Sequence, residues 1–151
     1  VSKLLMEVRS QCADRHPIPE VLSIGRPAWV WMDRERLASA LLHLVRNAQD
    51  ATPPDGQIRL ELEAAEDTLS IVVADTGCGM DAAFIRDRLF RPFDSTKGVQ
   101  GMGIGAYQVR HLVRAAGGDV EVRSEPAVGT TFVIKLPADT ATHRPASAQE
   151  A

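Results

Sequence analysis

Apolar and polar residues alternate in several stretches of the chain, and this alternation predicts β-strands. Strands are expected over residues 58–63, 119–125 and 130–137, with the turn PAVGT joining the last two. A more continuously apolar run, 69–74, predicts another strand. Two short β-prone stretches, VLSIG and AWVWMD, flank Gly25-Arg26-Pro27 and predict a hairpin.

Two other segments repeat their apolar residues every three or four positions, as amphipathic helices do. One begins after Asp33, a good N-cap, and ends near Ala51; the other covers residues 104–116. Residues 1–14 read as the end of a helix or as an extended lead-in, which two prolines then interrupt. Strands with one polar face, together with two long helices, predict a two-layer α/β sandwich.

Size and charge narrow the class of protein. A chain of 151 residues suits one domain with its own core. The formal charge of −3, without a basic block, argues against a nucleic-acid-binding surface. Two cysteines far apart in sequence fit a reducing compartment without a disulfide or a zinc site. No apolar run reaches the roughly 18 residues of a membrane span, so we expect a cytoplasmic domain without a membrane segment.

Polar residues line one edge of the first long helix, beside its apolar face. His43, Asn47 and Asp50 are spaced i, i+4 and i+7. This edge either borders a cleft or simply meets solvent. Asparagine is a poor interior helix former, and a role as an uncharged oxygen ligand of Mg²⁺ would explain Asn47.

A carboxylate ends the apolar strand at 69–74. Asp75 is followed by Gly77 and Gly79, which allow a sharp turn and the close approach of a flat ligand. A carboxylate held at a partly buried strand end can accept hydrogen bonds from an amino group such as that of adenine. The alternative is a tight turn with a local cap.

Glycines fill the segment GMGIGA before the second long helix. Gly101, Gly103 and Ala106 match a dinucleotide fingerprint, but polar residues precede them instead of a strand, so that site is rejected. The segment instead predicts a loop that leads to a helix N-terminus, where phosphate binds well. Lys97 could add charge there, while Phe90 and Phe93 would anchor the near end of the loop.

Taken together and in this order, these stretches resemble the ATP-binding catalytic domain of sensor histidine kinases, within the GHKL ATPase superfamily. The resembling motifs are HLVRNAQDA (N box), DTGCGM (G1 box), LFRPFDSTK (F box), GMGIGAY (G2 box) and the closing strands GGDVEVRSEPAVGTTFVIKLP. The resemblance covers about residues 20–137. It implies the Bergerat-type sandwich, with a mixed, mostly antiparallel sheet of about five strands and about three helices on one face. The sequences of the F box and the N box are most similar to those of nitrogen-regulation type kinases. The segment FDSTKGVQGMGIGAY resembles that of kinases linked to exosortase (PEP-CTERM) systems.

The resemblance also implies a set of residues that bind Mg·ATP. Asn47 would ligate Mg²⁺, Asp75 would bind the adenine amino group, and Thr130 would touch the adenine side. A lid over about residues 82–101 would cover the phosphates. The remaining implied contacts are the adenine-pocket residues Gly77 and Gly79, the phosphate-binding residues Gly101, Gly103, Gly105 and Lys97, and the secondary contacts Asp50 and Arg46.

One departure concerns the residue four positions before Asn47. Relatives that hydrolyse ATP carry a glutamate there as general base, whereas this chain has His43. Without that carboxylate, transfer to an incoming nucleophile is favoured over hydrolysis. Asn47, Lys97 and His43 are the candidate catalytic residues, and whether His43 itself acts as a base stays open.

The expected function is transfer of the γ-phosphoryl group of Mg·ATP to a histidine on a separate dimerisation domain, with a response regulator downstream. Residues 1–19 would end the connection from that domain, 20–137 would form the catalytic domain, and 138–151 would be a disordered tail. The parent protein could be anchored in a membrane. The rivals are a stand-alone serine kinase of the anti-sigma type and a nucleotide-dependent binding module.

Overall fold

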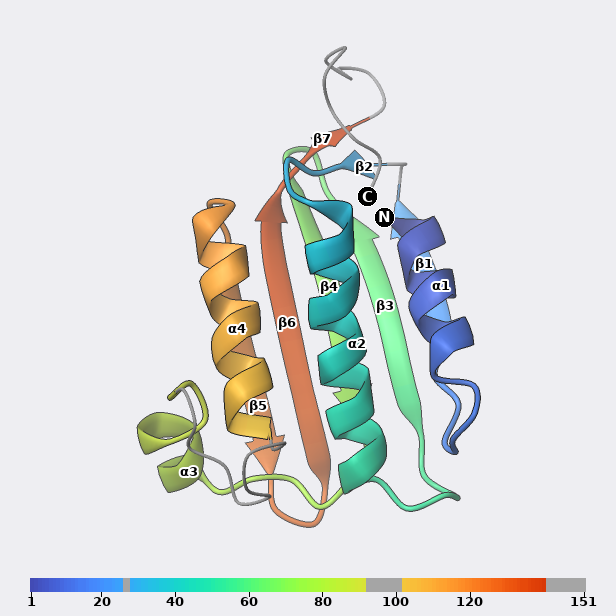
Figure 1. Cartoon of the computed structure of the whole chain (residues 1–151), viewed down its shortest axis with the longest axis vertical. Helices are drawn as coiled ribbons and strands as arrows, with labels where there is room; N and C mark the ends of the chain where they lie inside the picture. The colour runs from blue at the N-terminus through green and yellow to red at the C-terminus, as the bar shows by residue number, and fades with distance from the viewer. Residues whose placement is uncertain (26–27, 92–101, 141–151) are drawn as a thin grey trace.

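The computed structural model describes residues 1–25, 28–91 and 102–140. Helices α1, α2 and α4 lie side by side over one face of a sheet (Figure 1). This arrangement confirms the predicted two-layer sandwich. In chain order the elements are α1 (Ser2–Gln11), β1 (Glu20–Gly25), β2 (Ala28–Trp29), α2 (Arg34–Ala51), β3 (Ile58–Ala64), β4 (Thr68–Asp75), α3 (Ala82–Asp87), α4 (Met102–Ala115), β5 (Asp119–Glu125), β6 (Gly129–Pro137) and β7 (Asp139–Thr140).

The main sheet has five strands in the order β1-β3-β4-β6-β5. Its β1–β3 pair is parallel and its other pairs are antiparallel. Alternation turns Leu60 and Leu62 of β3 toward the helices, while Glu63 remains exposed on the other face. The sheet is therefore mixed and mostly antiparallel, as predicted, with one face covered and one face open.

Helix α2 lies in the middle of the helical layer (Figure 1) and forms as its sequence predicts. The carboxylate of Asp33 accepts hydrogen bonds from the backbone N–H groups of Glu35 and Arg36, which caps the first turn. The predicted apolar stripe is buried: Leu37, Leu41, Leu44, Val45 and Ala48. In the described part of the chain, no helix is both long and apolar enough to cross a membrane.

Helix α1 packs into the same core as α2. Its residues Leu4, Leu5 and Val8 are buried, and so is Cys12 just beyond its end. Burial raises the pKa of the Cys12 thiol, which keeps that thiol protonated at neutral pH. Of the two alternatives for residues 1–14, the structure has the helix. The role of residues 1–19 as a connection from another domain stays a prediction.

The predicted hairpin between the first two short strands is wrong. Strand β1 pairs in parallel with β3, and β2 pairs antiparallel with β7. A turn signal specifies a local bend but not the strand's partner. The crossover through α2 brings β1 beside β3 and buries the apolar stripe of that helix, which a local hairpin would not do.

The end of the described chain is more ordered than the predicted tail. Ala138 is buried and donates its backbone N–H to the carbonyl of Asp67, and Asp139–Thr140 form β7. The predicted tail therefore does not begin at residue 138. Its remainder, 141–151, lies outside the described residues.

Candidate functional site

A cavity of about 300 Å³ opens where β4 ends, next to the last turns of α2. Its wall comes from α2, β4, the loop after β4, α3 and β6. Most of the lining side chains are apolar, and a few polar groups stand among them, as is typical of small-molecule sites. The described residues that line it are Leu44, Asn47, Ala48, Asp50, Ala51, Val73, Asp75, Cys78, Gly79, Met80, Asp81, Phe84, Thr130 and Phe132.

Asp75 is the half-buried carboxylate of this cavity. Burial raises its pKa, and the backbone N–H groups of Gly77 and Thr130 partly offset that rise. The Gly77 N–H donates to Oδ1 at 2.8 Å, which orients the carboxylate at the end of β4. The cavity therefore contains a fixed hydrogen-bond acceptor in a partly apolar setting.

The glycines after Asp75 allow the loop to pack between α2 and the β5–β6 hairpin. A Cβ on Gly77 would collide with the carbonyl of Ala51, and one on Gly79 would collide with the carbonyl of Glu125. Gly79 also has φ +70°, which glycine adopts without strain. The sequence predicted room for a ligand at these glycines, and the structure adds close backbone packing as a reason for them.

Asn47 lines the cavity from α2, as predicted. Helix α4 passes close to it, because a Cβ on Gly105 would lie 3.5 Å from Asn47 Nδ2 and 3.6 Å from His43 Cβ. His43 is exposed and is not among the described residues that line the cavity. It lines a second groove, between α2 and α4, together with Tyr107 and His111.

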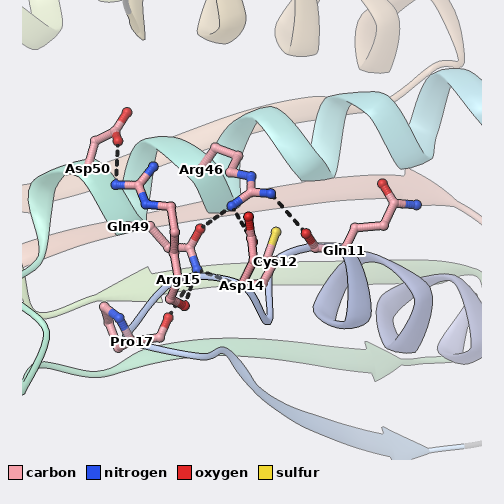
Figure 2. Close-up of polar contacts among 8 residues, drawn as sticks. All are labelled: Gln11, Cys12, Asp14, Arg15, Pro17, Arg46, Gln49 and Asp50. Carbon is pink, nitrogen blue, oxygen red and sulfur yellow. Dashed lines mark hydrogen bonds and ion pairs between the residues drawn. The ribbon is translucent and has the colours of Figure 1, made fainter.

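Two other polar residues of α2, Asp50 and Arg46, contact the end of α1 and the bend after it (Figure 2). Asp50 borders the cavity, but its carboxylate also pairs with Arg15 at 2.9 Å. Arg46 bonds Asp14 at 2.9 Å and the carbonyl of Gln11 at 2.9 Å. It is not among the described lining residues of the cavity, and its implied secondary contact stays a prediction.

Part of the predicted phosphate-binding segment lies outside the described residues, including Phe93, Lys97 and Gly101. Gly103 belongs to the first turn of α4. Phe90, the predicted anchor at the near end, packs against the core, and the Arg110 guanidinium lies 4.5 Å from the centroid of its ring.

The described residues contain no cluster of three or more His, Cys, Asp or Glu side chains that could hold a metal ion. The cavity offers the amide of Asn47, and the carboxylates that also line it, those of Asp50, Asp75 and Asp81, do not form such a cluster. This donor set does not enclose a metal, but it suits Mg²⁺ that arrives with its own phosphate and water ligands.

Sequence reasoning missed Ser124, which lies on β5 next to Thr130. Its hydroxyl contacts Thr130 Oγ1 at 2.8 Å. A signal was available: in the alternation of β5, Ser124 occupies the third helix-facing position after Val120 and Val122, where an apolar residue is expected.

Residues 32–140 match the family described as histidine kinase-, DNA gyrase B- and HSP90-like ATPases. Because this match covers most of the chain, the chain belongs to that family of ATP-binding domains. The predicted family is therefore confirmed, and with it a catalytic domain of the histidine-kinase type. The finer resemblances to nitrogen-regulation and exosortase-linked kinases stay predictions.

Similar proteins of known role are sensor kinases. The chain is 36% identical over 109 residues to the histidine protein kinase DivJ of Caulobacter vibrioides, covering 70% of this chain and 18% of DivJ. It is 39% identical over 106 residues to the C4-dicarboxylate transport sensor protein DctB of Rhizobium meliloti, covering 69% of this chain and 17% of DctB. The chain thus spans less than a fifth of the length of these relatives.

Solved structures agree with this assignment. The mycobacterial sensor histidine kinase MprB superposes with a TM-score of 0.73 at 28% identity, over 91% of each chain. Full-length ShkA, solved in complex with AMPPNP, superposes with a TM-score of 0.76 at 29% identity, over 93% of this chain and 30% of ShkA. The catalytic domain of ThkA, at 23% identity and a TM-score of 0.77, supports the fold alone.

Proposed function

We propose that this chain is the catalytic domain of a two-component sensor histidine kinase, which transfers the γ-phosphoryl group of Mg·ATP to a histidine on the dimerisation domain of its parent protein. A response regulator would receive the phosphoryl group next. The observation that carries the proposal is the cavity with Asp75 at the end of β4, in a chain of the ATPase family. The AMPPNP bound by the similar protein ShkA supports an adenine nucleotide as the ligand.

In this proposal the adenine ring occupies the apolar part of the cavity. Asp75 accepts a hydrogen bond from the amino group of adenine, and Thr130 contacts the same edge of the ring. Gly77 and Gly79 shape the pocket by keeping the loop close to α2 and β5. These contacts orient the nucleotide, because the Asp75 carboxylate is already held by backbone N–H groups and the Thr130 hydroxyl by the hydroxyl of Ser124.

The phosphates would extend from the cavity toward α4. The unpaired N–H groups at a helix start favour an anion, so the turn of Gly103 and Gly105 suits the phosphates. Gly101 and Lys97 would add contacts from the lid. Bound Mg²⁺ would neutralise phosphate charge, and the amide oxygen of Asn47 would be its protein ligand.

Phosphoryl transfer, rather than hydrolysis, follows from the groups near Asn47. His43 replaces the glutamate that activates water in hydrolysing relatives, and it lines the second groove rather than the cavity. This position, in the groove between α2 and α4 and outside the described lining of the cavity, does not favour His43 as a general base. Asp50 would act at most as a secondary contact, since it also pairs with Arg15.

The test is phosphorylation of a purified dimerisation domain that carries the phosphoacceptor histidine, using ATP labelled at the γ-phosphate. We expect label that is acid-labile and alkali-stable, as phosphohistidine is. Asp75→Asn should abolish it. The matched control is Asp67→Asn, because Asp67 is exposed in the turn between β3 and β4, at the other end of these strands.

Three results would contradict the proposal or part of it. Intact ATP binding without any phosphohistidine would favour a nucleotide-dependent binding module. Acid-stable label on a serine of a partner protein would favour the serine kinase. Equal activity of Asp75→Asn and Asp67→Asn would remove Asp75 from the adenine site.

A further inference from the structure

The hydroxyl of Ser124 is the centre of three hydrogen bonds beside the cavity. It accepts from the backbone N–H of Met80 at 2.8 Å and donates to the carbonyl of Gly129 at 3.0 Å. Its third contact is Thr130 Oγ1, at 2.8 Å. Ser124 and Thr130 are direct partners in the register of β5 and β6, so the strand pairing holds the two hydroxyls together.

The direction of the third bond follows from counting hydrogens. A serine hydroxyl has one hydrogen to donate and two lone pairs that accept. The carbonyl of Gly129 can only accept, so it takes the hydrogen of Ser124. The N–H of Met80 can only donate, so it uses one lone pair. Thr130 must therefore donate its own hydrogen to the second lone pair of Ser124.

This direction decides what Thr130 can offer a ligand. Its only hydroxyl hydrogen is used by Ser124, so the hydroxyl can only accept from a molecule in the cavity. Asp75, the strand partner of Thr130 on the other side, is also an acceptor when ionised. The Thr130 hydroxyl and the Asp75 carboxylate therefore both favour a hydrogen-bond donor on the ligand, such as an amino group, and both disfavour a carbonyl oxygen at the same place.

We propose that Ser124 is a specificity-determining residue, which keeps the Thr130 hydroxyl an acceptor and so makes the cavity select 6-amino purines over 6-oxo purines. The inference rests on the proposed function, since it assumes that a purine occupies the cavity. Ser124 acts through Thr130 and is a positioning residue for it. Without Ser124, the Thr130 hydroxyl is released to rotate and donate to a 6-oxo group.

The experiment compares the affinities for ATP and inosine triphosphate, which differ in the 6-substituent and in the hydrogen that the 6-oxo ring carries on N1; comparing the two nucleotides across the variants isolates the effect of Ser124. Calorimetric titrations in Mg²⁺ give both dissociation constants for the wild-type chain and for Ser124→Ala. We expect the preference for ATP to fall by about tenfold in Ser124→Ala, the equivalent of one hydrogen bond. Ser124→Thr, which keeps a hydroxyl, should retain the wild-type preference.

Two controls separate this role from a structural one. Loss of the Met80 bond can weaken both nucleotides, but it does not alter their ratio. In a Thr130→Val background, which has no hydroxyl to orient, Ser124→Ala should leave the ratio unchanged. Ser70→Ala provides the matched serine substitution, because Ser70 pairs with the exposed residues Glu63 and Lys135 on the open face of the sheet.

The outcomes distinguish the two proposals. An unchanged ratio in Ser124→Ala, with ATP still bound, would overturn the role of Ser124 and leave the proposed function intact. The role of Ser124 would also be overturned if Ser124→Ala changed the ratio of the two affinities equally in the wild-type and Thr130→Val backgrounds. Failure of the folded wild-type chain to bind ATP at all would overturn both.

Discussion

Replacing Gln49 with leucine removes the side chain that ties the bend after α1 to α2 (Figure 2). Gln49 is only 3% exposed. Its Nε2 donates to the carbonyls of Cys12 and Arg15 at 2.9 Å each and to that of Pro17 at 3.2 Å. Leucine has a similar volume, so the change deletes hydrogen bonds and leaves little cavity.

The expected cost can be worked from these bonds. An amide group donates two hydrogens, and each intramolecular hydrogen bond contributes about 1 kcal/mol net. Leaving one of the buried carbonyls without a donor adds about 1–3 kcal/mol. We therefore expect Gln49→Leu to lower the free energy of unfolding by about 3–5 kcal/mol, which corresponds to a fall in Tm of about 6–20 °C for a chain of this size.

Urea unfolding followed by circular dichroism measures this loss, and the slope of the transition shows whether the native state stays compact. Gln108→Leu is the matched control, because Gln108 is exposed on α4. It should change stability by about 0.5 kcal/mol or less. A loss for Gln49→Leu no larger than that of Gln108→Leu would refute the view that Gln49 holds α1 in place.

Three further substitutions test the site. Asp75→Asn should abolish detectable ATP binding, a loss of about a hundredfold or more in affinity, because the charged acceptor for the adenine amino group is removed. Because burial raises the pKa of Asp75, the folded chain holds this proton more tightly than the unfolded one. The bound proton therefore stabilises the fold at pH values below the unfolded pKa, and this stabilisation disappears as pH rises through the folded pKa. Replacing the carboxylate by the neutral Asp75→Asn side chain should therefore not destabilise the fold at neutral pH. ATP affinity should fall as pH drops through the raised pKa of Asp75, and titrations of wild type and Asp75→Asn across pH check this. Asn47→Ala should reduce Mg²⁺-dependent transfer more than it reduces binding of ATP without Mg²⁺, and equal losses would exclude Asn47 as the ligand. Gly129→Ala should cost about 2–4 kcal/mol in urea unfolding, because its Cβ would collide with the carbonyl of Asp75, whereas Gly117→Ala, with its nearest atom at 3.4 Å, should cost about 1 kcal/mol.

Local signals in the sequence predicted the parts of the fold that local physics determines. Asp33 caps α2 because its side chain reaches the first free N–H groups of the same helix. The alternation in β5 and β6 and the turn between them lie within about twenty residues. The stripe of α2 faces the core because helical spacing aligns it, whatever lies opposite.

Pairings between distant segments could not be predicted in the same way. Strand β1 found its partner in β3 across the whole of α2, and β2 found its partner in β7 at the far end of the described chain. Apolar alternation shows that a strand has a buried face, but many strands satisfy that condition. The choice depends on which pairing buries the helices, which is a property of the assembled fold.

The candidate site was predicted only in part for the same reason. Asp75 and Asn47 were identified from their places at a strand end and on a helix edge, and both line the cavity. The pairing of Asp50 with Arg15 depends on a bend far away in sequence. Ser124 became visible only once its hydroxyl could be placed beside Thr130.

Titration of the labelled chain with a non-hydrolysable ATP analogue, followed by the NMR signals of its backbone amides, tests most directly whether this cavity is the nucleotide site. We predict saturable shifts at the amides of Gly77, Gly79 and Thr130, and their loss in Asp75→Asn. Saturable shifts confined to the groove of Tyr107 and His111, with the cavity amides unchanged, would contradict the account.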